Sequence, residues 1–352
     1  MEDKQCSLKE AVAMIEDGSM ITFSGFTIWR RPMAAIYEMI RQGKRNLHLA
    51  EVNSGTHSEM LIGAGAVAIW ESCWVGHELY GKTPYCLDRK MKSEEIIAED
   101  YSHQHMLYRM QAGAMGIPYF PTWASRGTDI LNPDYDMLGK AGMRHGQDPR
   151  IPRQKFAYSD DPFYGEGELI HVPAVKPDVC IVHAQQVGNE GTVRIMGQTF
   201  SDEQAIKAAE KVIVLAEEIV PESFLREEPD RNLIPGYLVD AIVEVPWGAH
   251  PTGVFGCYDV DGDFIRDFSA ASKKEGTLEA WLQEWVYGIG SHEEYLDKLS
   301  VSRLNGLKAN SYYKFSTRTK RGMRSGKESI VCNARGLYHN RFAGCGLRKG
   351  GS

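Results

Sequence analysis

The sequence has few cysteines, and their arrangement excludes two kinds of stabilising site. Seven cysteines occur among 352 residues, and no two form a Cys-x-x-Cys pair. Disulfide frameworks and structural zinc sites both need paired or regularly spaced cysteines. We therefore expect no metal site and a reducing, cytoplasmic location.

Long hydrophobic runs are also absent. The longest apolar runs, such as Val212–Ala216, have the length of a strand, whereas a membrane helix needs about 20 apolar residues. The opening Met1-Glu2-Asp3-Lys4 lacks the basic and apolar order of a secretory signal. The sequence therefore predicts no membrane association.

Basic residues are scarce in most of the chain, whose formal net charge is −7. From Arg318 onward nine basic residues stand against Glu328 alone, so this tail carries +8 and the first 317 residues carry −15. Such an acidic body argues against nucleic-acid binding, which needs a basic face. We expect one α/β domain over residues 1–317 and a basic, loosely ordered tail over residues 318–352.

Strand-like and helix-like segments alternate along the chain. Ser7-Leu8-Lys9-Glu10 is a capping box that predicts a helix start. Pro32 suits the first turn of the next helix, which Gly43 closes. The predicted strands are Met20–Phe23, Asn46–Val52, Val67–Trp70, Ile96–Glu99, Ile117–Phe120, Val179–His183, Val212–Ala216 and Leu238–Val245; the predicted helices are Met33–Arg41, His103–Met115, Ser201–Lys211 and Leu278–Tyr287; Gly139–Gly165 is predicted as a long loop and Asn189–Gly191 as a hairpin turn.

This order predicts an α/β fold with an open, mostly parallel sheet and helices on both faces. Ligands of such sheets bind beyond the carboxyl ends of the strands, so the candidate site loops are Ser24–Thr27, Asn53–Gly55 and Ala124–Thr128. Gly25 follows a buried strand and lacks a Gly-x-Gly-x-x-Gly or P-loop context. Its N–H either faces a developing negative oxygen, or the glycine only permits a tight turn.

The segment from Asp17 to Pro32 carries a specific resemblance. Its Asp-Gly pair, apolar strand, Ser24-Gly25-Phe26 and later Pro resemble the CoA-binding signature of family I CoA-transferases, with Ser24 and Arg30 where glycines are usual. Within that family the sequence is similar to the A subunits of glutaconate CoA-transferases from about Ser7 to Leu307. The other blocks that carry the similarity are Glu99-Asp100-Tyr101-Ser102, His183-Ala184-Gln185-Gln186, Gly191–Ile195, Gly248-Ala249-His250-Pro251 and Glu294–Leu299.

The resemblance implies an enzyme of two kinds of subunit, A2B2 or larger, with the site between them. The partner, or B, subunit would supply a nucleophilic glutamate that forms an acyl-glutamyl anhydride and then a glutamyl-CoA thioester. Coenzyme A would be a substrate, with no permanently bound cofactor, and a short dicarboxylic acid the acceptor class. This chain would form the oxyanion and acyl-binding wall. The candidate contacts are Ser24, Gly25, Phe26, Thr27, Arg30, Asn53, Ser54, Ser125 and Arg126. By position alone, Arg126 is placed for a distal carboxylate. Arg30 and Arg31 either contact CoA phosphates or a substrate carboxylate or form a solvated pair.

His103 is the candidate catalytic residue. Transferases of the family usually have Gln at the matching position, where the amide stabilises the thioester oxyanion, and a His N–H can do the same. The related ring-cleaving hydrolases of steroid catabolism have a glutamate there. His103 acting as a general base on water is therefore the alternative, a CoA-thioester or C–C hydrolase.

Other polar residues are interpreted as structural or solvent-exposed rather than as part of the site. Glu190 lies in the hairpin turn, and Glu51 at a strand end is expected to be solvated and unpaired. His183 and His250 are expected to be structural, and His103 with His105 do not share a helix face as metal ligands would. A non-enzymatic sugar-phosphate sensor of related fold is a third hypothesis, which the lack of a helix-turn-helix segment and the acidic body disfavour.

Overall fold

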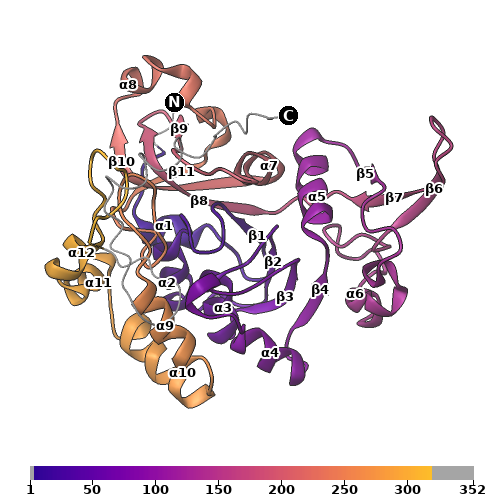
Figure 1. Cartoon of the computed structure of the whole chain (residues 1–352), viewed down its shortest axis with the longest axis horizontal. Coiled ribbons are helices and arrows are strands. Elements are labelled where there is room, and N and C mark those ends of the chain that lie inside the picture. The colour runs from indigo at the N-terminus through magenta and orange to yellow at the C-terminus, as the bar shows by residue number, and fades with distance from the viewer. Residues whose placement is uncertain (1–3, 319–352) are drawn as a thin grey trace, which may run out of the picture.

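The computed structural model describes residues 4–318 and is built around one large sheet (Figure 1). Its strand order is β11-β10-β8-β1-β2-β3-β4, and β9 pairs with β8. The strands are β1 (Met20–Phe23), β2 (Leu47–Ala50), β3 (Val67–Ser72), β4 (Ile97–Asp100), β8 (Val179–Gly188), β9 (Val193–Arg194), β10 (Lys211–Val220) and β11 (Ala241–Glu244). Only the β8–β9 pair is antiparallel among these strands. The predicted open, mostly parallel sheet is confirmed.

Helices cover both faces of this sheet because alternate strand residues point to opposite sides. Ile21 and Phe23 pack into one core with helices α1 (Leu8–Ala13), α2 (Met33–Arg41), α3 (Thr56–Gly63), α4 (Tyr85–Lys92), α9 (Gly262–Ala271), α10 (Glu275–Leu282) and α11 (His292–Leu299). Met20 packs into a second core with α5 (His103–Met115) and α7 (Asp202–Ala208). Both faces are therefore apolar, and polar groups concentrate where the strands end.

A small antiparallel sheet projects from one side of the molecule (Figure 1). Its order is β5-β7-β6, with β5 (Tyr119–Thr122), β6 (Ala157–Asp160) and β7 (Glu168–Pro173). Two predictions are wrong here. The strand after α5 does not join the main sheet, and the expected long loop Gly139–Gly165 contains β6. All four residues of β6 are exposed. Its sequence, Ala-Tyr-Ser-Asp, lacks the alternation of apolar and polar residues by which a half-buried strand is recognised.

Most other boundaries agree with the predictions to within a few residues. The Ser7–Glu10 capping box is present, but Ser201 gives α7 no side-chain cap. The last predicted helix divides into α10 and a π-helical segment, Gln283–Tyr287. The remaining helices are α6 (Met137–Lys140), α8 (Glu222–Arg226) and α12 (Val301–Leu307).

The predicted tail, 318–352, lies outside the described residues except for Arg318. Between residues 4 and 318, none of the helices is both long and apolar enough to cross a membrane.

Candidate active site

Strands β1 to β4 are parallel and end at one side of the sheet, which we call the carboxyl edge. The loop that leaves β1 there folds back on itself, with Phe26 and Trp29 exchanging backbone hydrogen bonds of 2.9 and 2.7 Å. Gly25 has φ +88°, and a Cβ at this position would overlap the carbonyl oxygens of Trp29 and Arg30. Glycine is therefore required for the turn.

The N–H of Gly25 donates to Asp202 Oδ1 at 2.7 Å, at the start of α7. This donor is therefore engaged within the chain, and the residue is buried. The alternative interpretation, a glycine that permits a tight turn, is the one the geometry favours.

Arg30 does not reach solvent as a phosphate ligand would. Its side chain is 3% exposed and forms an ion pair with Asp202. The same guanidinium donates to the carbonyl oxygens of His183 at 2.9 Å and Gln198 at 3.1 Å. Arg30 therefore joins the β1 loop to α7 and β8, and its contact with CoA phosphates or a substrate carboxylate stays a prediction.

The other residues of this loop are mostly buried as well. Ser24 Oγ accepts a hydrogen bond from His183 N at 2.9 Å, which joins the loop to β8. Thr27 is buried with φ +45°. Phe26 is partly exposed and packs edge-on against Phe200, with ring centroids 4.9 Å apart. Of the four predicted contacts Ser24–Thr27, Phe26 alone presents part of its surface to solvent.

The loop after β2 contains a buried carboxylate, which corrects the expectation for Glu51. Glu51 is 1% exposed rather than solvated. Its oxygens lie 2.7 Å from His57 Nε2 and accept hydrogen bonds from Ser54 at 2.8 Å and Ser58 at 2.5 Å. Arg31 Nη1 lies 3.6 Å away. The expected unpaired acid is thus the centre of a buried polar cluster, formed by Glu51, Arg31, Ser54, His57 and Ser58, which we call the Glu51 cluster.

The pKa values of His57 and Glu51 are both lowered, for different reasons. Burial lowers the pKa of His57 to about 4, which favours the neutral imidazole at pH 7. Burial acts to raise the pKa of Glu51, but its contacts with His57, Arg31 and Ser58 outweigh burial and hold that pKa below its usual range. Glu51 is therefore ionised and balanced by the Arg31 guanidinium.

Asn53 and Ser54 differ in how much they could offer a ligand. The Ser54 hydroxyl donates to Glu51 and accepts from Trp70 Nε1 at 2.8 Å, so it is fully engaged. Asn53 is 2% exposed, and its Nδ2 has no hydrogen-bond partner within residues 4–318. A buried amide without a partner is costly. Asn53 therefore keeps an amide group that no described residue engages, whereas the Ser54 hydroxyl both donates and accepts.

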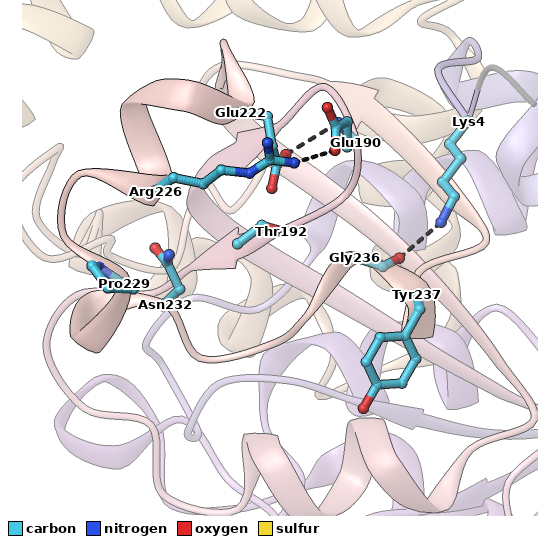
Figure 2. Close-up of a pocket in the computed structure, with 9 residues that line it drawn as sticks. All are labelled: Lys4, Glu190, Thr192, Glu222, Arg226, Pro229, Asn232, Gly236 and Tyr237. Atoms are coloured by element: carbon cyan, nitrogen blue, oxygen red, sulfur yellow. Dashed lines mark hydrogen bonds and ion pairs between the residues drawn. The ribbon is translucent and has the colours of Figure 1, made fainter. Parts of the chain in front are cut away.

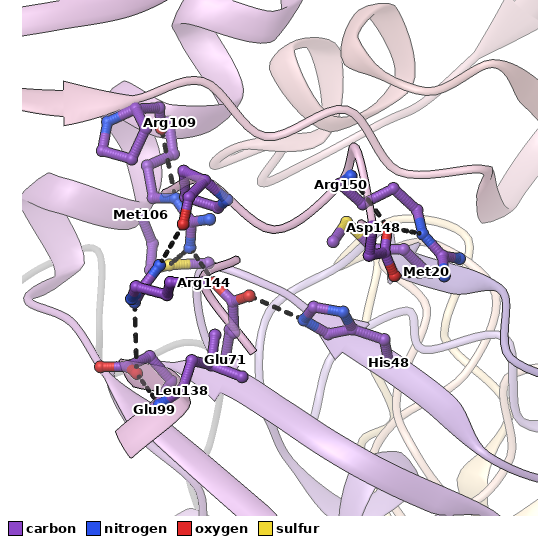
Figure 3. Close-up of polar contacts among 12 residues, drawn as sticks. Met20, His48, Glu71, Glu99, Met106, Arg109, Leu138, Arg144, Asp148 and Arg150 are labelled. Atoms are coloured by element: carbon purple, nitrogen blue, oxygen red, sulfur yellow. Dashed lines mark hydrogen bonds and ion pairs between the residues drawn. The ribbon is translucent and has the colours of Figure 1, made fainter. Parts of the chain in front are cut away.

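The glutamates of β3 and β4, like Glu51, form ion pairs with basic side chains (Figure 3). Glu71 is fully buried, pairs with Arg109 of α5 and lies 2.7 Å from His48 Nε2. Glu99 is fully buried, pairs with Lys155 at 2.5 Å and accepts a hydrogen bond from Leu138 N at 2.8 Å. The glutamates near the ends of β2, β3 and β4 are thus all occupied. Asp100, the last residue of β4, is exposed.

His103 is the first residue of α5 and is exposed at the carboxyl edge. Ser102 caps this helix by accepting from His105 N at 3.1 Å, so the helix start is well defined. Partial burial lowers the pKa of His103, which favours the neutral imidazole at pH 7. A neutral ring can donate one N–H and accept at its other nitrogen.

The loop after β5 lies beside this helix start, because His105 Nε2 is 3.3 Å from the carbonyl oxygen of Ala124. Ser125 is half-buried with φ +68°. Arg126 donates to the carbonyl oxygens of Glu166 at 3.0 Å and Glu168 at 2.8 Å. All three guanidinium nitrogens of Arg126 are engaged in this way, so its expected role with a distal carboxylate is not supported by this structure.

Hydrogen bonds connect the loops along the carboxyl edge. Ser54 N donates to Trp74 O at 2.8 Å, and Tyr101 N donates to Ser72 O at 3.0 Å. Arg31 joins the loop after β1 to the loop after β2. The loop after β4, which leads into α5, is the last of the connected loops. The Ser24–Thr27 and His103 segments therefore lie on one edge but are separated by β2 and β3.

A pocket of about 400 Å³ is lined by residues of the turn after β8 and of helix α8 (Figure 2). Glu190 and Arg226 form an ion pair in its wall, and Lys4 donates to Gly236 O at 2.8 Å. None of the predicted site residues lines it. Glu190 lies in the expected hairpin turn, where Gly191 has φ +103°.

The two histidines expected to be structural are both buried and paired within the chain. His183 pairs with Glu217 at 2.7 Å, and His250 lies 2.6 Å from the Tyr295 hydroxyl and 3.0 Å from Asp261. Both histidines are buried at 1% exposure or less.

Comparison with known proteins gives concordant results. A family model described as Coenzyme A transferase matches residues 6–245. The A subunit of glutaconate CoA-transferase from Acidaminococcus fermentans is 36% identical over 307 residues, which cover 87% of this chain and 94% of that protein. The A subunit of a 3-oxoadipate CoA-transferase from Pseudomonas knackmussii is 30% identical over 301 residues, 84% of this chain and 98% of that protein.

Among solved structures, glutaconate coenzyme A-transferase from Acidaminococcus fermentans superposes with a TM-score of 0.84 and 34% identity. The match covers 89% of this chain and 98% of that one. The similarity therefore extends over nearly the whole described fold, including the carboxyl edge.

Proposed function

The chain belongs to the coenzyme A transferase family, and from this premise we propose that it is the A subunit of an acyl-CoA:carboxylate CoA-transferase built from two kinds of subunit. Relatives that match it over most of their length are named as A subunits of such enzymes. We further propose an A2B2 or larger assembly with the site at the carboxyl edge, and a short dicarboxylic acid as substrate.

The observation that carries the proposed division of labour is the state of the three glutamates near the strand ends. Glu51, Glu71 and Glu99 are buried and each is paired with a base. A nucleophilic carboxylate must reach a thioester carbonyl with a free oxygen. These three cannot do so, which is consistent with a nucleophile supplied by the B subunit.

In the proposed reaction the partner's glutamate attacks the acyl-CoA carbonyl, and the thioester breaks to give an acyl-glutamyl anhydride and the CoA thiolate. The thiolate attacks the glutamyl carbonyl, releases the first acid and leaves a glutamyl-CoA thioester. A second acid then receives CoA by the same two steps in reverse. We assign the His103 N–H to the oxyanion of each tetrahedral intermediate, and Phe26 and Asn53 to the wall around the thioester.

The test is CoA exchange by the complex of this chain with its partner. We expect ping-pong kinetics, and we expect borohydride to trap the enzyme–CoA thioester in the B subunit. Asp100 is the exposed acid beside His103 that could act in place of the partner's glutamate. Loss of exchange in Asp100→Asn together with label in this chain would contradict the proposal.

A hydrolase is the second candidate, and the exposed His103 favours it. A neutral imidazole at the edge can take a proton from water. His103→Gln separates the two functions. Glutamine can donate to an oxyanion but cannot act as a base, so a transferase keeps its activity and a hydrolase loses it.

A further inference from the structure

Arg31 bridges the first two loops of the carboxyl edge. Its Nη1 donates to Ser24 O at 3.3 Å, and its Nη2 donates to Asn53 O. The side chain is 1% exposed, so neither carbonyl can exchange this donor for bulk water. The spacing of the two loops therefore depends on where the guanidinium lies.

The two loops also touch directly. A Cβ on Gly55 would overlap the carbonyl oxygen of Thr27, so the backbones meet with no room for a side chain. Displacement of one loop must then move the other, since close-packed interiors transmit small shifts. Phe26, Thr27, Asn53 and Ser54, all predicted contacts, lie on these two segments.

Glu51 forms an ion pair with Arg31, with 3.6 Å between Oε2 and Nη1. His57, Ser54 and Ser58 contact this carboxylate, and the buried Asp202 is a second negative charge that acts on the guanidinium. Arg31 Nε has no hydrogen-bond partner within the described residues. The direct contacts of the guanidinium are therefore the two carbonyl oxygens and the Glu51 carboxylate.

The Glu51 cluster does not have the geometry of a nucleophile with its base. Ser58 Oγ and Glu51 both approach the same nitrogen of His57, Nε2, at 3.0 and 2.7 Å. A relay needs the two groups on opposite ring nitrogens. Ser58 and His57 are also fully buried, so no substrate reaches them. The geometry of the Glu51 cluster therefore favours a role in holding the loops over a role in catalysis.

We propose that Glu51 is a positioning residue that, through Arg31, holds the loops Ser24–Arg31 and Asn53–Thr56 in the register that receives acyl-CoA. This inference rests on the proposed function for its ligand. The structural part of the proposal is that removing the Glu51 charge loosens these two loops together. It depends only on contacts within this chain and not on the proposed function.

The test compares Glu51→Gln with Glu59→Gln, a matched substitution of another buried glutamate. Glu59 is fully buried and accepts from Cys86 N at 2.9 Å and Leu87 N at 2.8 Å in the first turn of α4. Backbone hydrogen exchange is measured on each protein in complex with the B subunit. In Glu51→Gln the amides of residues 24–30 and 53–56 should exchange about ten-fold faster or more, with α4 unchanged, and Glu59→Gln should show the reverse.

Kinetics supply the second readout. Glu51→Gln should raise KM for acyl-CoA about ten-fold or more while kcat changes less, because the lost interaction orders the ground-state site. Glu51→Asp, which keeps the charge, should recover part of this loss. Glu59→Gln should leave KM unchanged.

Uniform exchange throughout the Glu51→Gln protein, or equal KM values in both variants, would overturn the positioning role. If the wild-type complex transfers no CoA, the proposed function fails instead. The exchange pattern still decides the structural part of the proposal in that case, so the two failures are distinguishable.

Discussion

The buried pair of Glu71 and Arg109 allows a quantitative prediction about the element that carries His103. Arg109 lies six positions after His103 on α5 and joins this helix to β3. Both side chains are fully buried. Arg109→Met keeps most of the apolar stem but leaves the carboxylate without its cation. Removing one partner of a buried pair costs about 3–5 kcal/mol, so we expect a loss of that size in the free energy of unfolding at pH 7.

The sign of the pH dependence follows from the pKa of Glu71. Burial acts to raise this pKa, but Arg109 and His48 hold it below its usual value. In the wild type Glu71 therefore stabilises the fold above pH 4.5, and this contribution is lost as the pH falls. In Arg109→Met burial prevails, the folded pKa rises, and Glu71 becomes a penalty that grows with pH. The stability difference should widen by up to about 1.4 kcal/mol per pH unit above pH 4.5 until the raised pKa is reached.

Urea unfolding of both proteins at pH 5, 6, 7 and 8 measures this difference. Lys92→Met is the control, because Lys92 and Asp88 form an exposed pair with side chains 74% and 50% exposed. That substitution should cost less than about 1 kcal/mol at every pH. A loss below about 1 kcal/mol in Arg109→Met, or one that does not vary with pH, would refute the reasoning.

Three further outcomes are expected. His103→Ala should lower kcat of the transferase about 10²–10³-fold, as loss of an oxyanion donor does; an unchanged kcat would remove His103 from the site. Gly55→Ala should lower the free energy of unfolding by about 1–3 kcal/mol, because its Cβ overlaps Thr27 O; thermal unfolding that matches the wild type would show that the loops can separate. Burial raises the pKa of Glu59 to about 7, so ionisation of this group costs stability as the pH rises from 4.5 towards 7. Glu59→Gln should flatten that part of the stability profile, and an unaltered profile would exclude Glu59 as its source.

Local signals explain which elements could be predicted. Helix α5 has the predicted limits because Ser102 caps its start and Gly116, with φ +70°, ends it. Strands β1 and β2 are buried on both faces and read as short, mostly apolar runs. Strand β6 is fully exposed and has no such signal, so the residue pattern there predicts a loop.

The sequence predicts where the candidate site residues lie in the fold better than it predicts the contacts that each side chain makes. The strand-to-loop order predicts that the loops after β1 and β2 share one edge of the sheet with the start of α5. The structure has this arrangement, and His103 lies exposed there. Glu51 is buried and paired rather than solvated. The contacts that engage Gly25 and Arg30 could not be predicted, because their common partner is distant in sequence. Asp202, which engages both Gly25 and Arg30, lies more than 170 positions away.

The amino-acid sequence by itself determined the alternation of strands and helices, the parallel sheet and the edge where its loops gather, because these depend on short-range periodicity and capping. Only the tertiary structure decided which polar side chains remain free. That outcome depends on which strands are neighbours, since burial and charge pairing arise between segments that meet only in the folded chain. Glu51, Glu71 and Glu99 look alike in the sequence as acids near strand ends, and folding pairs each with a base drawn from a different element.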